Sequence, residues 1–370
     1  MDTDNNIWKR EILFSAQEKG REKWTLEKVD KSYEFHIDVR YGKKCDISSL
    51  KKNWPFQKEI ELTRRKLDYF ERKSDFFSME KCPVCSSNKS HAEYKVNICG
   101  VDYMKCRTCG HYYATVFPSL DVVKEFYKEH LIEDPYYISP DEIALRLKEI
   151  YLPKRDWIVD VYKEQFGKEP RSILDFGAGS GHFLFACKKM GMKVAGIELD
   201  KDYVNWCKEQ FHIELCQDIG DLHGEKFDVV CSFNVIEHTY EPNEFVREYK
   251  AVMHERSLAV IETPRAESLT TRLQSVFPDE PRGMLIPYEH NHLFTDASLA
   301  TLLFQNGLAI NSIWYFGQDV SELILRIGHE LNSDTTVIFN KLYESLQRAI
   351  DLSHCSDLML VAAIPYSGGE

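Results

Sequence analysis

The sequence predicts an α/β protein with a doubly wound, mostly parallel sheet, preceded by smaller N-terminal units. From about residue 170 onward, short apolar runs alternate with helical segments, at the spacing typical of parallel strands joined by helices. The first of these runs ends in Asp175, and a glycine-rich turn follows it and opens a helix. Strand, glycine turn and helix in this order are typical of a ligand-binding edge.

The length of 370 residues indicates more than one domain. We expect an accessory α+β segment, a cysteine module, a helical connector broken at prolines, and the doubly wound domain. The connector breaks are expected at Pro135, Pro140 and Pro153. The domain boundaries are placed at 1–78, 79–118, 119–169 and 170–370.

Composition excludes several classes of protein. No apolar run approaches the roughly 18–20 residues that span a bilayer, so no membrane partner is expected. The polar, acidic N-terminus lacks a signal-peptide pattern, which predicts a cytoplasmic protein. The net charge of −12 argues against a bulk nucleic-acid binder. The sequence does not indicate an oligomeric state.

Seven strands and five helices are expected in the C-terminal domain. The helices are expected near 181–190, 201–210, 243–253, 296–306 and 335–352. The strands are expected at 172–175, 193–197, 213–215, 227–232, 257–262, 308–316 and 357–364. The last of them follows a long excursion at 317–356, which allows it to return antiparallel. A further strand is indicated by the alternation of apolar residues from Tyr33 to Val39, and a charged helix by residues 56–72.

The glycine turn predicts a nucleoside-bearing ligand. Glu198 follows it by about 20 residues at the end of the next apolar run, where an acid can accept hydrogen bonds from ribose hydroxyls. A phosphate-binding P-loop is excluded because His182, not lysine, follows Gly181. The Gly-x-Gly-x-Gly spacing disfavours a dinucleotide and a nicotinamide oxidoreductase. Asp175 would repel a pyrophosphate and suits a ligand with a cationic amino group.

These residues resemble the class I S-adenosylmethionine-dependent methyltransferases, from about residue 171 to 316 and more loosely to 364. The resemblance rests on Ile-Leu-Asp-Phe-Gly-Ala-Gly-Ser-Gly at 173–181, Val-Ala-Gly-Ile-Glu-Leu-Asp at 194–200, and Phe-Asp-Val-Val-Cys-Ser-Phe-Asn-Val-Ile-Glu-His at 227–238. It implies a Rossmann-like, seven-stranded sheet and S-adenosyl-L-methionine as the cofactor. The alternative is a glycine turn needed only for tight strand–helix packing.

The resemblance also implies a role for each cofactor-site residue. The amino-acid end of the cofactor would be held by Asp175 and the loop, and the ribose by Glu198, with Leu199 in the same set. Asp218 would bond the adenine amino group, and Asn234 would line the methionine side. The loop residues implied are Gly177, Ala178, Gly179 and Gly181.

Two Cys-x-x-Cys pairs predict a metal site. Cys82 and Cys85 precede Cys106 and Cys109 by 20 residues, a spacing at which four thiolates can form the tetrahedron of structural Zn²⁺. The alternatives are free thiols or an iron centre, and Cys99 and His111 lie nearby. The module resembles the zinc ribbon at the N-terminus of some bacterial methyltransferases, several of which act on sugars or other small metabolites.

Histidine is the natural base for removing a proton from a methyl acceptor near neutral pH. Glu237 and His238 follow the fourth strand, at the edge where ligands bind in open α/β sheets. His290 and His292 lie in a long insertion, 264–294, that can overhang the same edge. Tyr288 is a weaker candidate. The alternative is that these histidines only shape the pocket or anchor the loop.

The sequence therefore predicts a methyltransferase for a small-molecule acceptor, with a sugar or sugar nucleotide as one option. O-, N- and C-methylation are not separable at this level. The alternatives are an RNA or protein methyltransferase, and a non-catalytic scaffold protein that binds the cofactor and recruits a partner.

Overall fold

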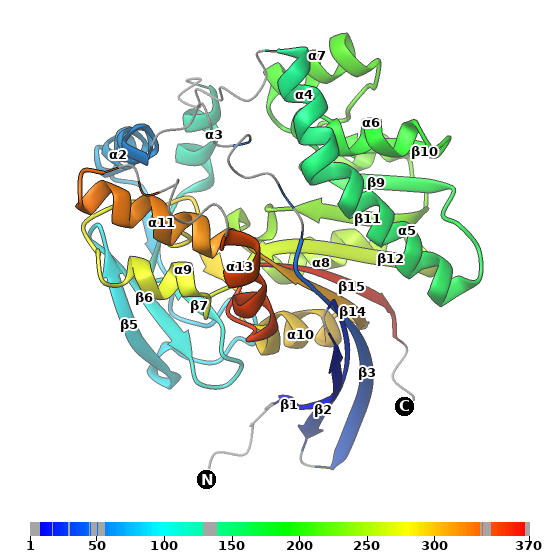
Figure 1. Cartoon of the computed structure of the whole chain (residues 1–370), viewed down its shortest axis with the longest axis horizontal. Coiled ribbons are helices and arrows are strands. Elements are labelled where there is room, and N and C mark those ends of the chain that lie inside the picture. The colour runs from blue at the N-terminus through cyan, green and yellow to red at the C-terminus, as the bar shows by residue number, and fades with distance from the viewer. Residues whose placement is uncertain are drawn as a thin grey trace.

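The structure is a computed structural model that describes residues 8–366, except 17, 29, 44, 46–49, 51–55, 129–138, 334 and 336–341 (Figure 1). Its main feature is a nine-stranded sheet in the order β1-β2-β3-β14-β15-β12-β11-β9-β10. The bounds are β1 Trp8–Ala16, β2 Lys19–Lys28, β3 Lys31–Tyr41, β9 Ser172–Phe176, β10 Lys193–Ile197, β11 Phe227–Phe233, β12 Met253–Pro264, β14 Leu308–Phe316 and β15 Leu358–Pro365.

The C-terminal part of this sheet follows the prediction with one exception. Strands β9 to β12 pair in parallel, and β15 returns antiparallel between β12 and β14, as the sequence allowed. The strand expected at 213–215 is wrong: Cys216 makes only an isolated bridge to Ile197. The pairing is centred on Cys216, whose amide donates to the Gly196 carbonyl at 2.8 Å and whose carbonyl accepts from the Glu198 amide at 2.9 Å.

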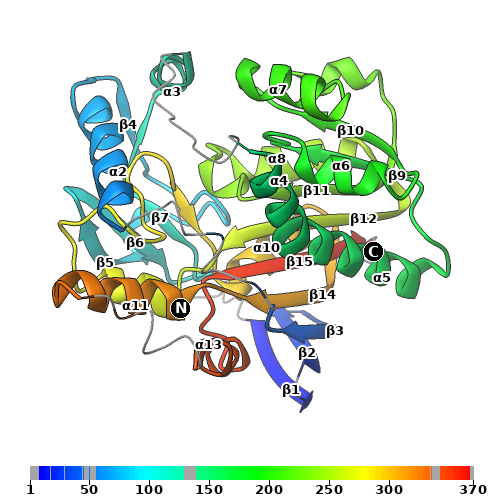
Figure 2. The ribbon, with the colours of Figure 1, turned by 45° about the horizontal axis from the view of Figure 1, so that its top comes forward.

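Three N-terminal strands extend the sheet past β14 (Figure 2). The strand predicted from Tyr33 to Val39 is confirmed as β3, which pairs in parallel with β14. Alternate residues of β2 and β3 are buried, among them Trp24, Ile37 and Val39. These side chains belong to the same core as residues of β11, β12 and β14. Since β3 is parallel to β14, both strands end at the same edge of the sheet as β9, β11 and β12.

Helices cover both faces of the sheet, and the side chains of each strand alternate between them. Leu174 and Val230 face one core, together with α8 and α10. Ile173 and Val229 face the other, together with α5, α6 and α7. This two-residue period is that of a strand buried on both sides. The bounds are α5 Leu152–Phe166, α6 His182–Lys188, α7 Lys201–Phe211, α8 Pro242–Ala251 and α10 Asp296–Gln305.

The connector is more continuous than predicted. Helix α4 (Pro140–Arg146) begins at a proline and leads through a π turn at Leu147–Tyr151 directly into α5. The break expected at Pro153 is therefore wrong. Proline is tolerated in a first turn, and the π turn ahead of it changes the local hydrogen-bond pattern. Pro135 lies outside the described residues. The other helices are α2 Phe56–Glu71, α3 Leu120–Lys128, α9 Leu269–Gln274, α11 Asp319–Glu330 and α13 Tyr343–Leu352.

The cysteine module contributes three strands to a second, four-stranded sheet in the order β13-β7-β6-β5. The fourth strand, β13, comes from the insertion after β12, so the module and the C-terminal domain share a sheet. The bounds are β5 Ala92–Ile98, β6 Val101–Cys106, β7 Tyr112–Ala114 and β13 His292–Leu293, with a separate pair β4 Phe76–Ser78 and β8 Val116–Pro118. No helix in the described residues is long and apolar enough to cross a membrane.

Candidate active site

The glycine turn folds tightly between the ends of two parallel strands. The amides of Gly177 and Ala178 donate to the Ile197 carbonyl at 2.8 and 3.0 Å. Gly177 and Gly181 have φ of +68° and +76°, a region that favours glycine. A Cβ on Gly181 would lie 2.3 Å from the Cys207 sulfur. These two glycines are therefore required for packing as well as for the turn.

Gly179 differs from its neighbours because a Cβ built there meets no atom within 4 Å. Its amide donates to Glu198 at 2.7 Å, and the other carboxylate oxygen accepts from the Asp200 amide at 2.8 Å. Leu199, between these acids, is 72% exposed. The turn thus presents an open side bordered by Glu198, and the Glu198 oxygens keep further lone pairs for a ligand.

Asp175 is a buried acid at the end of β9. It is 2% exposed, and in the described part of the chain no cation forms an ion pair with its carboxylate; the Lys154 ammonium, which pairs with Glu262, acts on it only as a nearby charge. The nearest polar contact is a weak one from the Cys231 thiol at 3.6 Å. Burial raises the pKa of Asp175 to about 8. An ionised carboxylate there requires a cationic partner, so the observed environment fits a ligand with an ammonium group.

Asp218 and Asn234 complete the predicted cofactor set at the same edge. Asp218 is exposed and caps a short 3₁₀ turn by accepting from the Gly220 amide at 2.7 Å. Asn234 follows β11 with φ of +54°, and its amide nitrogen donates to Glu262 at 3.2 Å. Both side chains are oriented by the protein itself.

The structure adds two residues that the sequence interpretation missed. Glu262, at the end of β12, is fully buried and accepts from the Lys154 ammonium at 2.7 Å. Lys154, on α5, is 5% exposed. The signal for Glu262 was present, since it ends an apolar strand as Asp175 and Glu198 do. Lys154 gave no comparable signal, because it stands in a helix whose polar and apolar residues are not separated onto two faces.

Two of the predicted histidines meet at the candidate acceptor side. The ring centroids of His238 and His290 are 4.8 Å apart. Nδ1 of His238 bonds the Glu289 carbonyl at 2.9 Å, and Nδ1 of His290 bonds the Met284 carbonyl at 2.8 Å. A carbonyl only accepts, so each Nδ1 carries the proton and each Nε2 offers a lone pair. Burial lowers the pKa of His238, and it lowers that of His290 to about 3.

Glu237 lies with this pair, and one ligand atom from each of Glu237, His238 and His290 falls within 4.8 Å of the others. Glu237 is fully buried; one oxygen accepts from Thr263 at 3.3 Å, and the other has no hydrogen-bond partner among the described residues. Burial raises the pKa of Glu237 to about 8. The carboxyl therefore holds its proton near neutral pH in this arrangement.

His292 is placed differently from His290. It is fully buried, its Nε2 bonds the Thr239 carbonyl at 2.8 Å, and its Nδ1 accepts from His111 at 3.1 Å. Both ring nitrogens are thus engaged within the protein. The ring joins β13 to the cysteine module and to the turn after β11, which is an anchoring arrangement. Tyr288, the weaker candidate, packs against Phe70 and Phe76.

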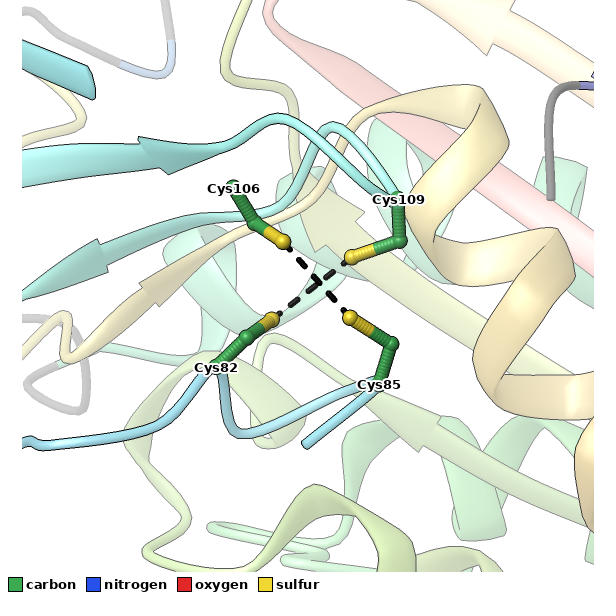
Figure 3. A group of neighbouring side chains, drawn as sticks. All are labelled: Cys82, Cys85, Cys106 and Cys109. Carbon is green, nitrogen blue, oxygen red and sulfur yellow. Dashed lines mark hydrogen bonds between the residues drawn. The ribbon is translucent and has the colours of Figure 1, made fainter. Parts of the chain in front are cut away.

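The four predicted cysteines converge on one point (Figure 3). The sulfurs of Cys82 and Cys109, and those of Cys85 and Cys106, are each 3.6 Å apart. A tetrahedral Zn²⁺ with bonds of about 2.3 Å separates its sulfurs by about 3.8 Å. Hydrogen bonding to its neighbours lowers the pKa of Cys106 and raises that of Cys109. The cluster has the geometry of a closed four-thiolate metal site.

The cysteine module also contacts the histidine loop. The Tyr103 hydroxyl donates to the His290 carbonyl at 3.2 Å, and Asn243 at the start of α8 donates to the Pro83 carbonyl at 2.9 Å. A site that holds the two knuckles together therefore also fixes the loop that carries His290.

Comparison with known proteins finds similarity to methyltransferases. Residues 152–313 match the family model described as a methyltransferase domain. The ubiquinone biosynthesis O-methyltransferase of Hydrogenovibrio crunogenus is 26% identical over 97 residues, 24% of this chain and 40% of the relative. The ajmaline N-methyltransferase of Rauvolfia serpentina is 28% identical over 126 residues, 31% of this chain and 43% of the relative. The chain spans about half the length of the curated relatives it matches.

Solved methyltransferase structures are also similar to this chain. The plantazolicin methyltransferase BpumL in complex with SAH has a TM-score of 0.42 at 18% identity, covering 66% of this chain and 96% of its own. An S-adenosylmethionine-dependent methyltransferase from Archaeoglobus fulgidus has a TM-score of 0.42 at 20% identity, covering 62% and 100%.

Gly181 is tightly packed and Gly179 is open, so substituting each by alanine separates the effect of packing from the effect of backbone strain. We expect Gly181→Ala to lower the free energy of unfolding by about 3 kcal/mol, through left-handed strain and the clash with Cys207. In Gly179→Ala only the left-handed backbone strain acts, so we expect the free energy of unfolding to fall by about 1–2 kcal/mol. Urea denaturation of both variants measures the difference. Equal losses in the two variants would contradict the packing role of Gly181.

Proposed function

We propose that this chain is an S-adenosylmethionine-dependent methyltransferase that acts on a small-molecule acceptor. The observation that carries the proposal is the buried Asp175, which has no ion-pair partner among the described residues, beside a glycine turn with an open side at Gly179. When bound, the cofactor supplies a methyl group already activated on a sulfonium. The protein must then bind it, exclude water, orient the acceptor and remove a proton where the acceptor has one.

The residues present suit that cofactor. Asp175 would pair with the amino group, and Glu198 would accept from the ribose hydroxyls. Leu199, being exposed beside Glu198, offers an apolar contact, and Asp218 would accept from the adenine amino group. Asn234, held by Glu262, would line the methionine side. The remaining contacts would come from the loop residues Gly177, Ala178, Gly179 and Gly181.

We propose His238 and His290 as the proton-accepting pair, with Glu237 as their neighbour. Each histidine has its Nδ1 proton bonded to a backbone carbonyl, which leaves Nε2 available, and each is neutral near pH 7. His292 would anchor the loop. The curated relatives with printed substrates, ubiquinone biosynthesis and ajmaline, support a small-molecule acceptor, while a sugar or sugar nucleotide rests only on the zinc-ribbon resemblance.

We further propose that Cys82, Cys85, Cys106 and Cys109 hold a structural Zn²⁺. The sulfur separations fit a closed tetrahedron, and four crowded thiolates need a cation between them. None of the eleven cysteines forms a disulfide, which supports a reducing compartment such as the cytoplasm.

Cofactor binding should depend on pH through Asp175. The free carboxyl has a pKa of about 8 and holds a proton below that value, whereas pairing with an ammonium group requires it to be ionised. The affinity for SAH should therefore rise between pH 6 and 7.5, by up to about tenfold per pH unit. Calorimetry should also show uptake of the released proton by buffer. Asp175→Asn should bind more weakly and lose the pH slope; a variant that binds like the wild type would refute the assignment.

Histidine base catalysis is tested on an acceptor panel scored by SAH release. Removing a general base lowers the rate by about 10²- to 10⁴-fold. We therefore expect His238→Gln or His290→Gln to lower kcat by at least about 10²-fold. SAH affinity should stay close to that of the wild type, because neither ring belongs to the proposed cofactor set. His36→Gln, an exposed position in β3, is the control. Full turnover in both variants would eliminate histidine as the base.

The metal assignment is tested by elemental analysis of purified protein. Wild type should carry one Zn²⁺ per chain, and Cys106→Ser should lose it and unfold at a lower temperature. Cys99→Ser is the matched control, since Cys99 lies in the same module but outside the cluster. Substitution with Co²⁺ should give thiolate charge-transfer bands in the wild type and in Cys99→Ser but not in Cys106→Ser. Full zinc content in Cys106→Ser would contradict a four-thiolate site.

A further inference from the structure

A cavity of about 330 Å³ lies at the ends of β3 and β14, between the start of α5 and helix α13. Helix α13 packs against β14 and β3 (Figure 2). Gly42 is fixed in this wall because its amide donates to the Tyr315 carbonyl at 2.8 Å, and its own carbonyl accepts from Trp314 at 2.7 Å. Because β3 and β14 are parallel to β9, β11 and β12, the cavity opens at the edge that carries the candidate cofactor site.

Contiguous side chains connect this cavity to that site. Lys43, in the cavity wall, interacts electrostatically with Lys154 and Glu262. Lys154 pairs with Glu262 at 2.7 Å, and the same Glu262 oxygen accepts from Asn234. Asn234 is the residue proposed to line the methionine side. The cavity is therefore beside the point where a methyl group would be transferred.

Helix α13 presents a polar face to the cavity. Tyr343, Gln347 and Asp351 are spaced four residues apart, so they lie on one side of the helix, with Arg348 next to them. Both ends of the Gln347 side-chain amide have partners. Its nitrogen donates to Asp319 and Asp351, and its oxygen accepts from the Val320 amide. In contrast, the Tyr343 hydroxyl, one Arg348 nitrogen and one Asp351 oxygen are buried and have no hydrogen-bond partner among the residues that the structure describes.

The chemistry of these three atoms is that of hydrogen-bond donors. Arg348 and Tyr343 donate by nature. Burial raises the pKa of Asp351 to about 8, so its carboxyl is protonated near neutral pH and can donate as well. Lys43 adds a second cation, and burial lowers its pKa to about 8. The acids Glu18 and Glu344 are exposed at the rim.

Building on the proposed methyl transfer, we propose that this cavity binds the acceptor and recognises an oxyanion group on it, a carboxylate or a phosphate. Arg348, Tyr343 and Asp351 donate to the anionic oxygens, and Lys43 neutralises the charge on the side facing Lys154. Unpartnered buried donors are costly, and an oxyanion accepts from all of them at once. The N-terminal strands thus contribute directly to acceptor recognition, through the residues that follow β3.

The test measures binding of inorganic phosphate and of acetate to protein saturated with SAH, by calorimetry at constant ionic strength. We expect saturable binding of at least one anion; tighter binding of phosphate assigns a phosphorylated acceptor, and tighter binding of acetate a carboxylic acid. Arg348→Gln and Tyr343→Phe should each weaken it about tenfold or more, since each removes a hydrogen bond to a charged group.

Arg247→Gln is the matched control, because Arg247 is exposed on α8 and pairs only with Glu244 in the described residues. It should bind the anion like the wild type, and all variants should keep their SAH affinity and melting temperature. Absence of anion binding by the wild type, or unchanged binding in both cavity variants, overturns the inference while leaving methyl transfer intact. Failure of the wild type to bind SAH would instead remove the proposed function.

Discussion

The buried ion pair between Lys154 and Glu262 is the interaction on which the candidate site depends. Both side chains are almost completely excluded from solvent, and the desolvation of two charges is offset only by close, well-oriented contacts. The pair joins the connector helix α5 to the end of β12. The same carboxylate holds Asn234 in its left-handed conformation. A single acid thereby sets the distance between helix, sheet and the proposed methyl-transfer point.

Segments outside the methyltransferase domain supply the walls around this point. The cysteine module contributes Tyr103 and shares a sheet with β13, which fixes the histidine loop. The N-terminal strands reach the same edge from the opposite end of the large sheet, because β3 adds in parallel to β14. Neither the cysteine module nor the N-terminal strands need to hold a reacting group in order to shape the site. Each positions residues that the methyltransferase domain alone does not contain.

The sequence predicted those features that depend on local pattern. Alternating or continuous apolar runs identified six strands of the C-terminal sheet, and the Gly-x-Gly-x-Gly turn with its flanking acids indicated the ligand edge. The cysteine spacing predicted the convergence of four sulfurs. In each case the signal lies within a few residues, where backbone geometry and hydrophobic period act directly.

The features that depend on long-range pairing were not predictable. Nothing in residues 31–41 shows that this strand pairs with residues near 312, and nothing near His292 shows that His111 occupies its second nitrogen. His290 and His292 look equivalent in sequence, two residues apart. One bonds a carbonyl through Nδ1 and the other is enclosed between two elements, and only tertiary packing distinguishes them.

Electrostatics give the proposed cofactor site and the cavity beside α13 opposite character, and this asymmetry matches the roles proposed for them. Asp175, Glu198 and Glu262 gather acids at the ends of β9, β10 and β12, which suits a cofactor that is cationic at both its amino group and its sulfonium. Across Lys154, the cavity beside α13 holds Lys43 and Arg348 and a protonated Asp351. A cationic donor and an anionic acceptor placed in these two positions attract each other along the line of transfer. Reversing the two proposed ligands would bring like charges together on both sides, so the charge pattern favours the proposed arrangement of cofactor and acceptor.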